Sequence, residues 1–132
     1  MENMKKNWFN IVGCAFLILI FIIGYLQLIN LEKRKKITIG TITGSKLIRG
    51  LYITYNYEVD SNIYSGLTTA NGISSDKIYK YLKGKKFPIV YDSMDFYQSH
   101  ILIFENEFKS LKLNYPDSLK WVCDSVRLKD CK

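Results

Sequence analysis

The sequence predicts a mainly β fold of the α+β class: an N-terminal transmembrane helix, then a small five-stranded antiparallel barrel-like sheet with one short helix and a C-terminal helical segment. Residues 7–31 are uncharged and strongly apolar, apolar and polar residues alternate over residues 51–60, and turn formers separate several short apolar runs. We expect a membrane anchor with basic flanks over residues 1–36 and one small β-rich domain over residues 37–132.

The apolar stretch has the length and the flanks of a membrane span. About 25 residues at about 1.5 Å each make a helix of about 37 Å, which exceeds the roughly 30 Å of a hydrocarbon core. Basic residues border the stretch on both sides, and Trp8 lies at its entry, where aromatic rings settle at the headgroup level. We predict a span over about residues 8–31. Its membrane-anchoring residues are Trp8, Lys33, Arg34, Lys35 and Lys36.

Three other interpretations of the stretch remain open. A cleaved secretory signal has a shorter apolar region, of about 7 to 15 residues, followed by a small-residue cleavage site, whereas this stretch ends in Asn-Leu-Glu-Lys at residues 30–33. Residues 11–14 (Ile-Val-Gly-Cys) resemble a lipobox, but most of the apolar region follows Cys14 instead of preceding it. A buried helix of a soluble domain needs no basic cluster at each end. The flanks favour the span.

The distribution of charge favours a lipid partner over nucleic acid. The net charge is +7, from 19 Lys and Arg against 12 Asp and Glu, and residues 1–36 contribute more than half of it. Cations beside a span contact anionic headgroups, so we expect the lipid bilayer as a partner and no nucleic-acid binding. The other basic cluster, Lys83, Lys85 and Lys86, is expected in a solvated loop. Because more cations follow the span than precede it, the positive-inside bias favours a cytoplasmic C-terminal domain.

The first half of the β-rich domain predicts a hairpin and a bent first strand. Residues 51–60 alternate as a half-buried strand does, and residues 63–69 can return as its partner after the turn at residues 60–62. The alternation of the first strand, from Ile37, slips at Gly40-Thr41. We expect a β-bulge there, because small barrels need bent strands.

The second half predicts one short helix, two strands and a helical end. Ser75 is placed to cap a helix, and Gly84 is placed to end it. Residues 87–91 and 100–104 read as strands, the second apolar on both faces and therefore central. Pro116 and Asp117 suit a helix start, and the apolar residues after them recur at helical spacing; Tyr115 and Trp121 are placed to close the open end of the barrel.

Three motifs occur in a characteristic order after the apolar stretch. They are Gly-Thr-Ile-Thr-Gly at residues 40–44, Tyr-Asn-Tyr-Glu-Val-Asp at residues 55–60, and Phe-Pro-Ile-Val-Tyr-Asp at residues 87–92 with Ser99 beyond. This order resembles a bacterial membrane family catalogued as a domain of unknown function, with one or two membrane helices and a small β domain. The pattern departs at residues 93–97, where a proline-rich turn is expected. The resemblance implies the architecture and a bacterial inner membrane, and it transfers no activity and no functional residue.

Few residues have the chemistry of a catalytic or metal site. His100 is the only histidine, and no Cys or His spacing typical of a zinc site accompanies it. Ser99 and His100 lie beside Asp92 and Asp95, but adjacent residues of a strand point to opposite faces, which separates a nucleophile from its base. The two aspartates are instead expected to accept backbone hydrogen bonds within their turn. We predict no metal, no cofactor and no enzymatic activity.

Two cysteines near the C-terminus report on the compartment. If one helix contains both Cys123 and Cys131, their Cα atoms lie about 12 Å apart, which is too far for a disulfide. If the tail is irregular, they can close a small loop on the oxidising side of the membrane. Free thiols are expected in the cytoplasm.

Two functional hypotheses follow from the sequence. The first is a membrane-tethered interaction module for another membrane or envelope protein, with Tyr52 and Tyr64 on the polar side of the sheet as contacts, or as plain cross-strand pairs. The second is a small tethered hydrolase or ligand-binding domain that uses the loop at residues 92–100. A nucleic-acid-binding barrel is a third and poorer hypothesis, because the sequence lacks a concentrated basic face.

Overall fold

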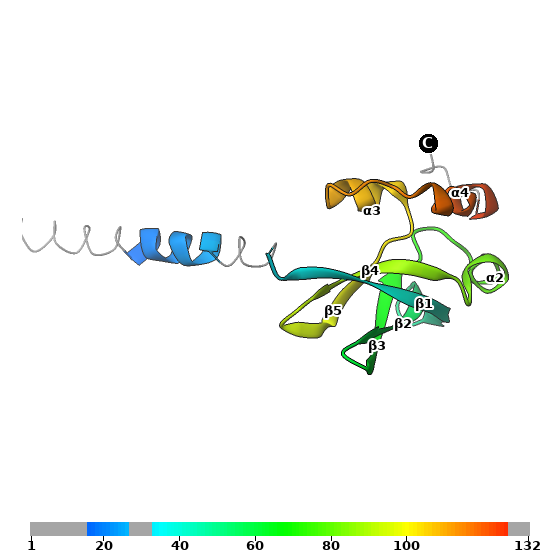
Figure 1. The fold of residues 1–132 in the computed structure, drawn as a ribbon, viewed down its shortest axis with the longest axis horizontal. Helices are drawn as coiled ribbons and strands as arrows, with labels where there is room; N and C mark the ends of the chain where they lie inside the picture. Colours follow the sequence, from blue (N-terminus) through cyan, green and yellow to red (C-terminus); the bar gives the residue numbers. More distant parts are fainter. Residues whose placement is uncertain (1–15, 27–32, 127–132) are drawn as a thin grey trace, which may run out of the picture. The chain divides into compact units, whose positions relative to one another are not determined.

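The computed structural model describes residues 16–26 and 33–126 (Figure 1). The chain divides into two compact units, residues 1–35 and residues 36–132. In the first unit, residues 16–26 form an α-helix. Trp8 and the two ends of the predicted span lie outside the described residues. Among the helices at residues 16–26 and 33–126, none combines the length and the apolar character that crossing a bilayer requires.

The second unit contains a five-stranded sheet that curls into a nearly closed barrel (Figure 1). Its order is β3-β2-β1-β4-β5, and β1–β2, β2–β3 and β4–β5 pair in antiparallel fashion. The two end strands, β3 and β5, lie close together without pairing. The predicted α+β class and barrel-like sheet are thereby confirmed. The strands are β1 (Lys35–Leu47), β2 (Leu51–Val59), β3 (Asn62–Thr69), β4 (Lys86–Asp92) and β5 (Asp95–Ile101).

The first strand bends at a bulge, but two residues later than the sequence indicated. The β1–β2 register runs from Gly40 opposite Tyr57 to Ile42 opposite Tyr55, and then shifts between Ile42 and Gly44. Gly40 keeps the regular register and has another role. A Cβ at this position would lie 2.6 Å from Ile89 Cγ1, so the glycine lets β1 and β4 pack tightly. The predicted bulge at residues 40–41 was therefore misplaced because a packing glycine resembled a bulge glycine.

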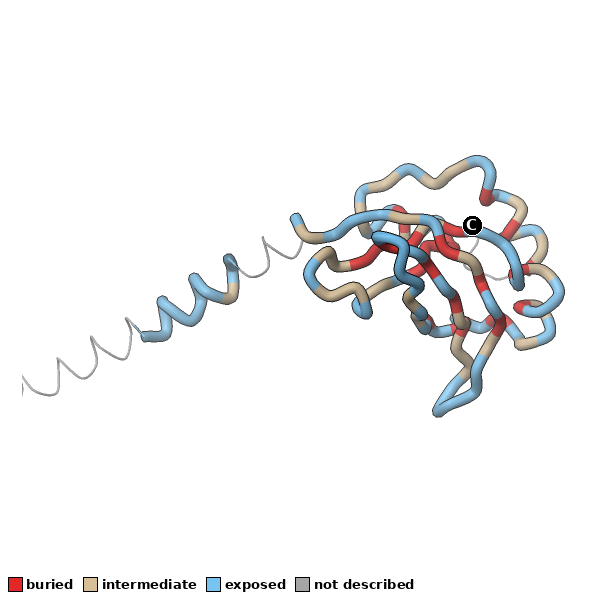
Figure 2. Tube along the Cα trace, turned by 60° about the horizontal axis from the view of Figure 1, so that its bottom comes forward, coloured by how far each residue is buried: buried red, intermediate tan, exposed pale blue. Residues whose placement is uncertain are grey.

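The predicted half-buried strand is confirmed in β2. Ile53, Tyr55, Tyr57 and Val59 are buried, and the residues between them are partly or fully exposed. This alternation puts one face of β2 on the core and the other in water. Figure 2 shows the buried positions gathered inside the barrel and beneath the helices.

The connection from β3 to β4 contains the short helix that the sequence predicted. It consists of α2 (Ser75–Lys77) and a π-helical turn, η1 (Ile78–Leu82), with Ile78 and Leu82 buried. Gly84 follows with φ 78°. The cap is one residue earlier than predicted, at Ser74, and no side chain caps the helix. Ser75 instead joins the helix to β1, because its Oγ lies 2.9 Å from Ser45 Oγ.

The fifth strand differs from the prediction in its residue range and in its place in the sheet order. Residues 100–104 were expected as a central strand, whereas β5 ends at Ile101 and lies at the end of the sheet order. Leu102, Ile103 and Phe104 are buried because the chain turns over the barrel there and enters α3 (Glu105–Ser110), a helix the sequence did not predict. An apolar run at residues 101–104 is therefore explained by burial beneath the start of α3, although a central strand would show the same pattern.

The helical C-terminal segment is confirmed. Pro116 precedes η2 (Asp117–Leu119), and α4 (Trp121–Val126) follows. The Tyr115 hydroxyl donates to the carbonyl oxygens of Leu119 at 2.8 Å and of Ile103 at 3.3 Å, which ties the segment to the end of β5. The Trp121 ring lies 6.3 Å from that of Phe87 at the start of β4. Among the residues that the structure describes, the buried core residues all lie between residues 42 and 126, so the second unit has a core of its own.

Candidate functional site

A continuous series of aromatic rings runs from the core to the surface where β3 faces β5. Neighbouring ring centroids are 5.3 to 6.2 Å apart. Such distances are typical of favourable aromatic pairs. We call this cluster the aromatic seam. Its members are Tyr55, Tyr57, Tyr64, Tyr91, Phe96 and Tyr97.

Side chains close the seam where backbone pairing is missing. The Tyr55 hydroxyl lies 3.1 Å from Ser99 Oγ, and the Tyr57 hydroxyl donates to the carbonyl oxygen of Phe96. Both bonds connect β2 to β5 across β3. Burial raises the pKa of Tyr55 and of Tyr57, so both hydroxyls keep their protons at neutral pH.

A glycine in β3 makes room for the bond between Tyr55 and Ser99. Gly66 lies opposite Tyr55 in the β2–β3 register, and a Cβ at this position would lie 2.3 Å from Tyr55 Cζ. Without a side chain at Gly66, the Tyr55 ring crosses β3 and its hydroxyl reaches Ser99. The Tyr55 contribution to closure of the seam therefore depends on Gly66.

Three large apolar side chains that belong to the seam or lie close to its residues in sequence are exposed to water. Ile63 is 74% exposed, Met94 74% and Tyr97 77%. Tyr97 rests edge-on against Tyr64, with an interplanar angle of 82°. An apolar group this exposed gains free energy when a partner covers it.

The β4–β5 turn beside the seam is held by its own aspartates, as predicted. The backbone N–H of Met94 donates to Asp92 Oδ1 at 2.8 Å, and that of Tyr97 donates to Asp95 Oδ1 at 3.2 Å. Gln98 Nε2 also donates to Asp95 Oδ2 at 3.1 Å. These bonds fix the backbone that presents Met94 and Tyr97.

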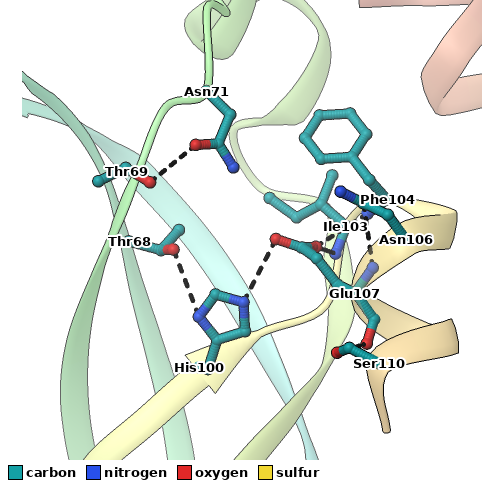
Figure 3. Close-up of polar contacts among 9 residues, drawn as sticks. All are labelled: Thr68, Thr69, Asn71, His100, Ile103, Phe104, Asn106, Glu107 and Ser110. Carbon is teal, nitrogen blue, oxygen red and sulfur yellow. Dashed lines mark hydrogen bonds and ion pairs between the residues drawn. The ribbon is translucent and has the colours of Figure 1, made fainter. Parts of the chain in front are cut away.

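His100 links three elements at the other end of the seam (Figure 3). Its Nδ1 lies 3.5 Å from Thr68 Oγ1 on β3, and its Nε2 lies 3.3 Å from Glu107 Oε1 on α3. Ser99, its neighbour, bonds to Tyr55 instead. Ser99 and His100 therefore serve different partners, as the alternation of a strand requires.

The Glu107 carboxylate accepts hydrogen bonds from both β5 and the start of α3. Its Oε2 accepts the backbone N–H groups of Ile103 at 2.7 Å and of Phe104 at 3.0 Å, and these cap α3. Burial alone would raise the pKa of Glu107, but the hydrogen bonds from His100, Phe104 and Ile103 hold it below its ordinary value. Glu107 is ionised at neutral pH and joins α3 to the barrel.

The two tyrosines predicted as contacts lie on opposite sides of the sheet. Tyr52 is on the outer face, paired with Thr69 and Lys46 in the strand registers. Tyr64 was expected on the polar face, and this placement was wrong. Its ring packs against Tyr57 and Phe96 in the aromatic seam. The structure therefore brings Tyr64 together with the residue 92–100 loop and separates it from Tyr52.

The membrane-anchoring residues are described only in part. Lys33, Lys35 and Lys36 are exposed and Arg34 is half-buried, and Trp8 lies outside the described residues. Phe96, Tyr97 and Met94 were not predicted as contact residues from the sequence. Their signal was the apolar content of a turn that also carries two aspartates, which is unusual for a solvated loop.

The described residues include one cysteine and no cluster of metal ligands. Cys123 is disulfide-bonded, and the other two cysteines of the sequence, Cys14 and Cys131, lie outside the described residues. Over residues 16–26 and 33–126, no three His, Cys, Asp or Glu side chains gather closely enough to hold a metal ion.

The chain was compared with family models, curated proteins and solved structures. No family model, no curated protein and no solved structure matches it. The resemblance to a bacterial membrane family therefore stays a prediction from the sequence motifs.

Proposed function

We propose that this chain is a single-pass, membrane-anchored interaction module of the bacterial envelope, without enzymatic activity. In this proposal the apolar N-terminal stretch holds the protein in the bilayer, and the aromatic seam contacts another membrane or envelope protein. The observation that carries the proposal is the exposure of Tyr97 in the aromatic seam, and of Ile63 and Met94 close to seam residues in sequence.

The helix at residues 16–26 supports the membrane part of the proposal. Its large apolar side chains are 49% to 81% exposed, and nothing in the described part of the chain covers them. Cationic residues follow the stretch at residues 33–36. In a bilayer, the apolar side chains of such a helix contact hydrocarbon and its basic flank contacts anionic headgroups.

Two indications bear on the side of the membrane. The count of basic residues favours the cytoplasm, whereas the disulfide at Cys123 favours an oxidising compartment. The positive-inside rule is a statistical bias, but disulfides persist only where thiols are not kept reduced. We therefore propose that the β-rich domain lies outside the cytoplasm.

Charge around the seam indicates the chemistry of the partner. Four acidic residues lie at or next to the β2–β3 and β4–β5 turns: Glu58, Asp60, Asp92 and Asp95. An interface with an apolar centre and an acidic rim fits a partner with apolar or aromatic residues bordered by Lys or Arg. Such charges guide association and discriminate against acidic partners.

A photo-crosslinking amino acid at Tyr97 tests the proposal in intact membranes. Leu47, at the far end of β1, is 78% exposed and serves as the matched control position. We expect one discrete adduct from Tyr97 and none from Leu47. The adduct should weaken on Tyr64→Ala, which removes support for Tyr97, and persist on Tyr52→Ala. Equal crosslinking from both positions would refute a specific contact at the seam.

A second candidate function, a small hydrolase, is favoured by one arrangement. Thr68, His100 and Glu107 place a hydroxyl, an imidazole and a carboxylate in sequence. This order resembles that of a catalytic triad. Thr68 is only 8% exposed, which limits access of a substrate to its hydroxyl. Hydrolysis of an activated ester that disappears in a folded His100→Ala variant would establish this candidate over the interaction module.

A further inference from the structure

A group of exposed lysines marks the end of the barrel opposite the β2–β3 and β4–β5 turns. Lys80 lies in η1 and Lys83 at its C-terminal end, Lys85 lies in the connection into β4, and Lys86 is the first residue of β4. All four are exposed. We call this group the lysine face. Within residues 16–26 and 33–126, none of the four forms an ion pair with a carboxylate.

Aromatic rings hold three of these ammonium groups on the surface. Lys83 Nζ lies 4.9 Å from the Tyr79 ring centroid, Lys80 Nζ lies 5.2 Å from that of Tyr81, and Lys85 Nζ lies 6.0 Å from that of Trp121. Distances of up to about 6 Å give cation–π attraction. The rings compensate the charges only partly, so the ammonium groups remain available to an anion.

The acidic residues at the β2–β3 and β4–β5 turns lie away from the lysine face. Asp92 stands at the opposite end of β4 from Lys86, about 20 Å away along a seven-residue strand. The turn residue Asp60 belongs to the same end as Asp92, because Tyr57 of β2 bonds to Phe96 just past the β4–β5 turn. Near the lysine face, Asp76 and Asp124 share a groove with Lys80. Of the four lysines of the face, Lys83, Lys85 and Lys86 lie outside the groove that contains these two aspartates.

We propose that the lysine face docks onto the anionic phospholipid headgroups of a bilayer. Lysines and tyrosines side by side are typical of membrane interfaces, where ammonium groups contact phosphate and amphipathic rings lie at headgroup depth. The inference rests on the proposed membrane attachment, to which it adds a second point of contact. It revises the expectation that Lys83, Lys85 and Lys86 form only a solvated loop.

The same geometry argues against single-stranded nucleic acid as the occupant. Proteins that bind such strands combine cations with open aromatic faces on which bases stack. Here an ammonium group lies over each of the rings of Tyr79, Tyr81 and Trp121. A bilayer needs only the charges and does not need a free ring face.

Vesicle binding by residues 36–132 tests the inference, because this unit has a core of its own. The probes are phosphatidylcholine vesicles with and without phosphatidylglycerol. Trp121, the only tryptophan in this segment, lies beside Lys85 and reports binding by its fluorescence. We expect binding only when phosphatidylglycerol is present, and we expect added salt to weaken it.

Substitution of the lysine face gives the decisive comparison. Replacing Lys83, Lys85 and Lys86 by Gln should weaken binding by about 100-fold, at about five-fold per cation. The same change at Lys109, Lys112 and Lys120, which are exposed on or near α3 and α4, should weaken it by less than about three-fold. Thermal unfolding of both triple variants checks that they are folded.

Three results would overturn the inference. They are equal loss in the two triple variants, no binding to phosphatidylglycerol vesicles, and tighter binding of a single-stranded oligonucleotide than of vesicles. Flotation of the full chain with pure phosphatidylcholine vesicles tests the anchor separately, because the lysine face contributes nothing on a zwitterionic surface. Failure of the anchor and failure of the lysine face are thus distinguishable.

Discussion

Gly66→Ala should destabilise the barrel by forcing the Tyr55 ring away from Ser99. The new Cβ would lie 2.3 to 2.4 Å from Cζ, Cε2 and Oη of a tyrosine that is fully buried. Overpacking of this kind costs about 1 to 3 kcal/mol, and replacing a strand glycine returns about 0.5 to 1 kcal/mol. The net loss is about 1 kcal/mol, which lowers the Tm of a domain of this size by about 4 to 8 °C.

Thermal unfolding of residues 36–132, followed by circular dichroism, measures this loss. Gly50→Ala is the matched control, since a Cβ at Gly50 meets no atom within 4 Å. We expect its Tm to stay within about 2 °C of the parent, because surface substitutions change stability little. If Gly66→Ala unfolds at the same temperature as the control, the account of how Tyr55 closes the seam is wrong.

Three further substitutions test the contacts around the barrel. Glu107→Gln should lower stability at pH 7 by about 1.5 to 3 kcal/mol, because it removes charged hydrogen bonds to Ile103, Phe104 and His100. The pKa of Glu107 is depressed in the folded state, so this difference should shrink in urea titrations as the pH falls below about 4.5 and through the folded pKa. Tyr115→Phe removes the donor to Leu119 and Ile103, and should cost about 1 kcal/mol in the same assay. Cys123→Ser should lower the free energy of unfolding by about 2 to 5 kcal/mol, and a reductant should abolish the difference from the parent chain.

Strands whose residue pattern depends only on burial of one face could be predicted from the sequence. The alternation in β2 was read correctly because one face of the strand meets the core and the other meets water. In β3 the pattern is inverted. The inward positions hold Tyr64, Gly66 and Thr68, whereas the exposed positions include Ile63 and Leu67. Because the exposed positions of β3 are apolar and one inward position is a glycine, the alternation predicted Tyr64 on the face opposite to the one it occupies.

The aromatic seam required information that no local pattern contains. Its members come from four strands, and they meet only because β3 and β5 close the barrel. The residue 92–100 segment was read as a loop because Asp92 and Asp95 are turn formers, although β5 begins at Asp95. Its contact with Tyr64 depends on long-range topology, which sequence periodicity does not encode.

Closure of the barrel by side chains leaves two strand edges that shield one another. Backbone groups along the facing edges of β3 and β5 are kept from other chains by the Tyr55, Tyr57 and His100 contacts. An unshielded strand edge is a template for pairing with another molecule. Conditions that break these contacts would therefore allow the β4–β5 hairpin of one molecule to pair with β3 of another. In a bilayer, the location that we propose for this chain, molecules meet at high two-dimensional concentration, and loss of the seam should then favour strand-exchanged dimers.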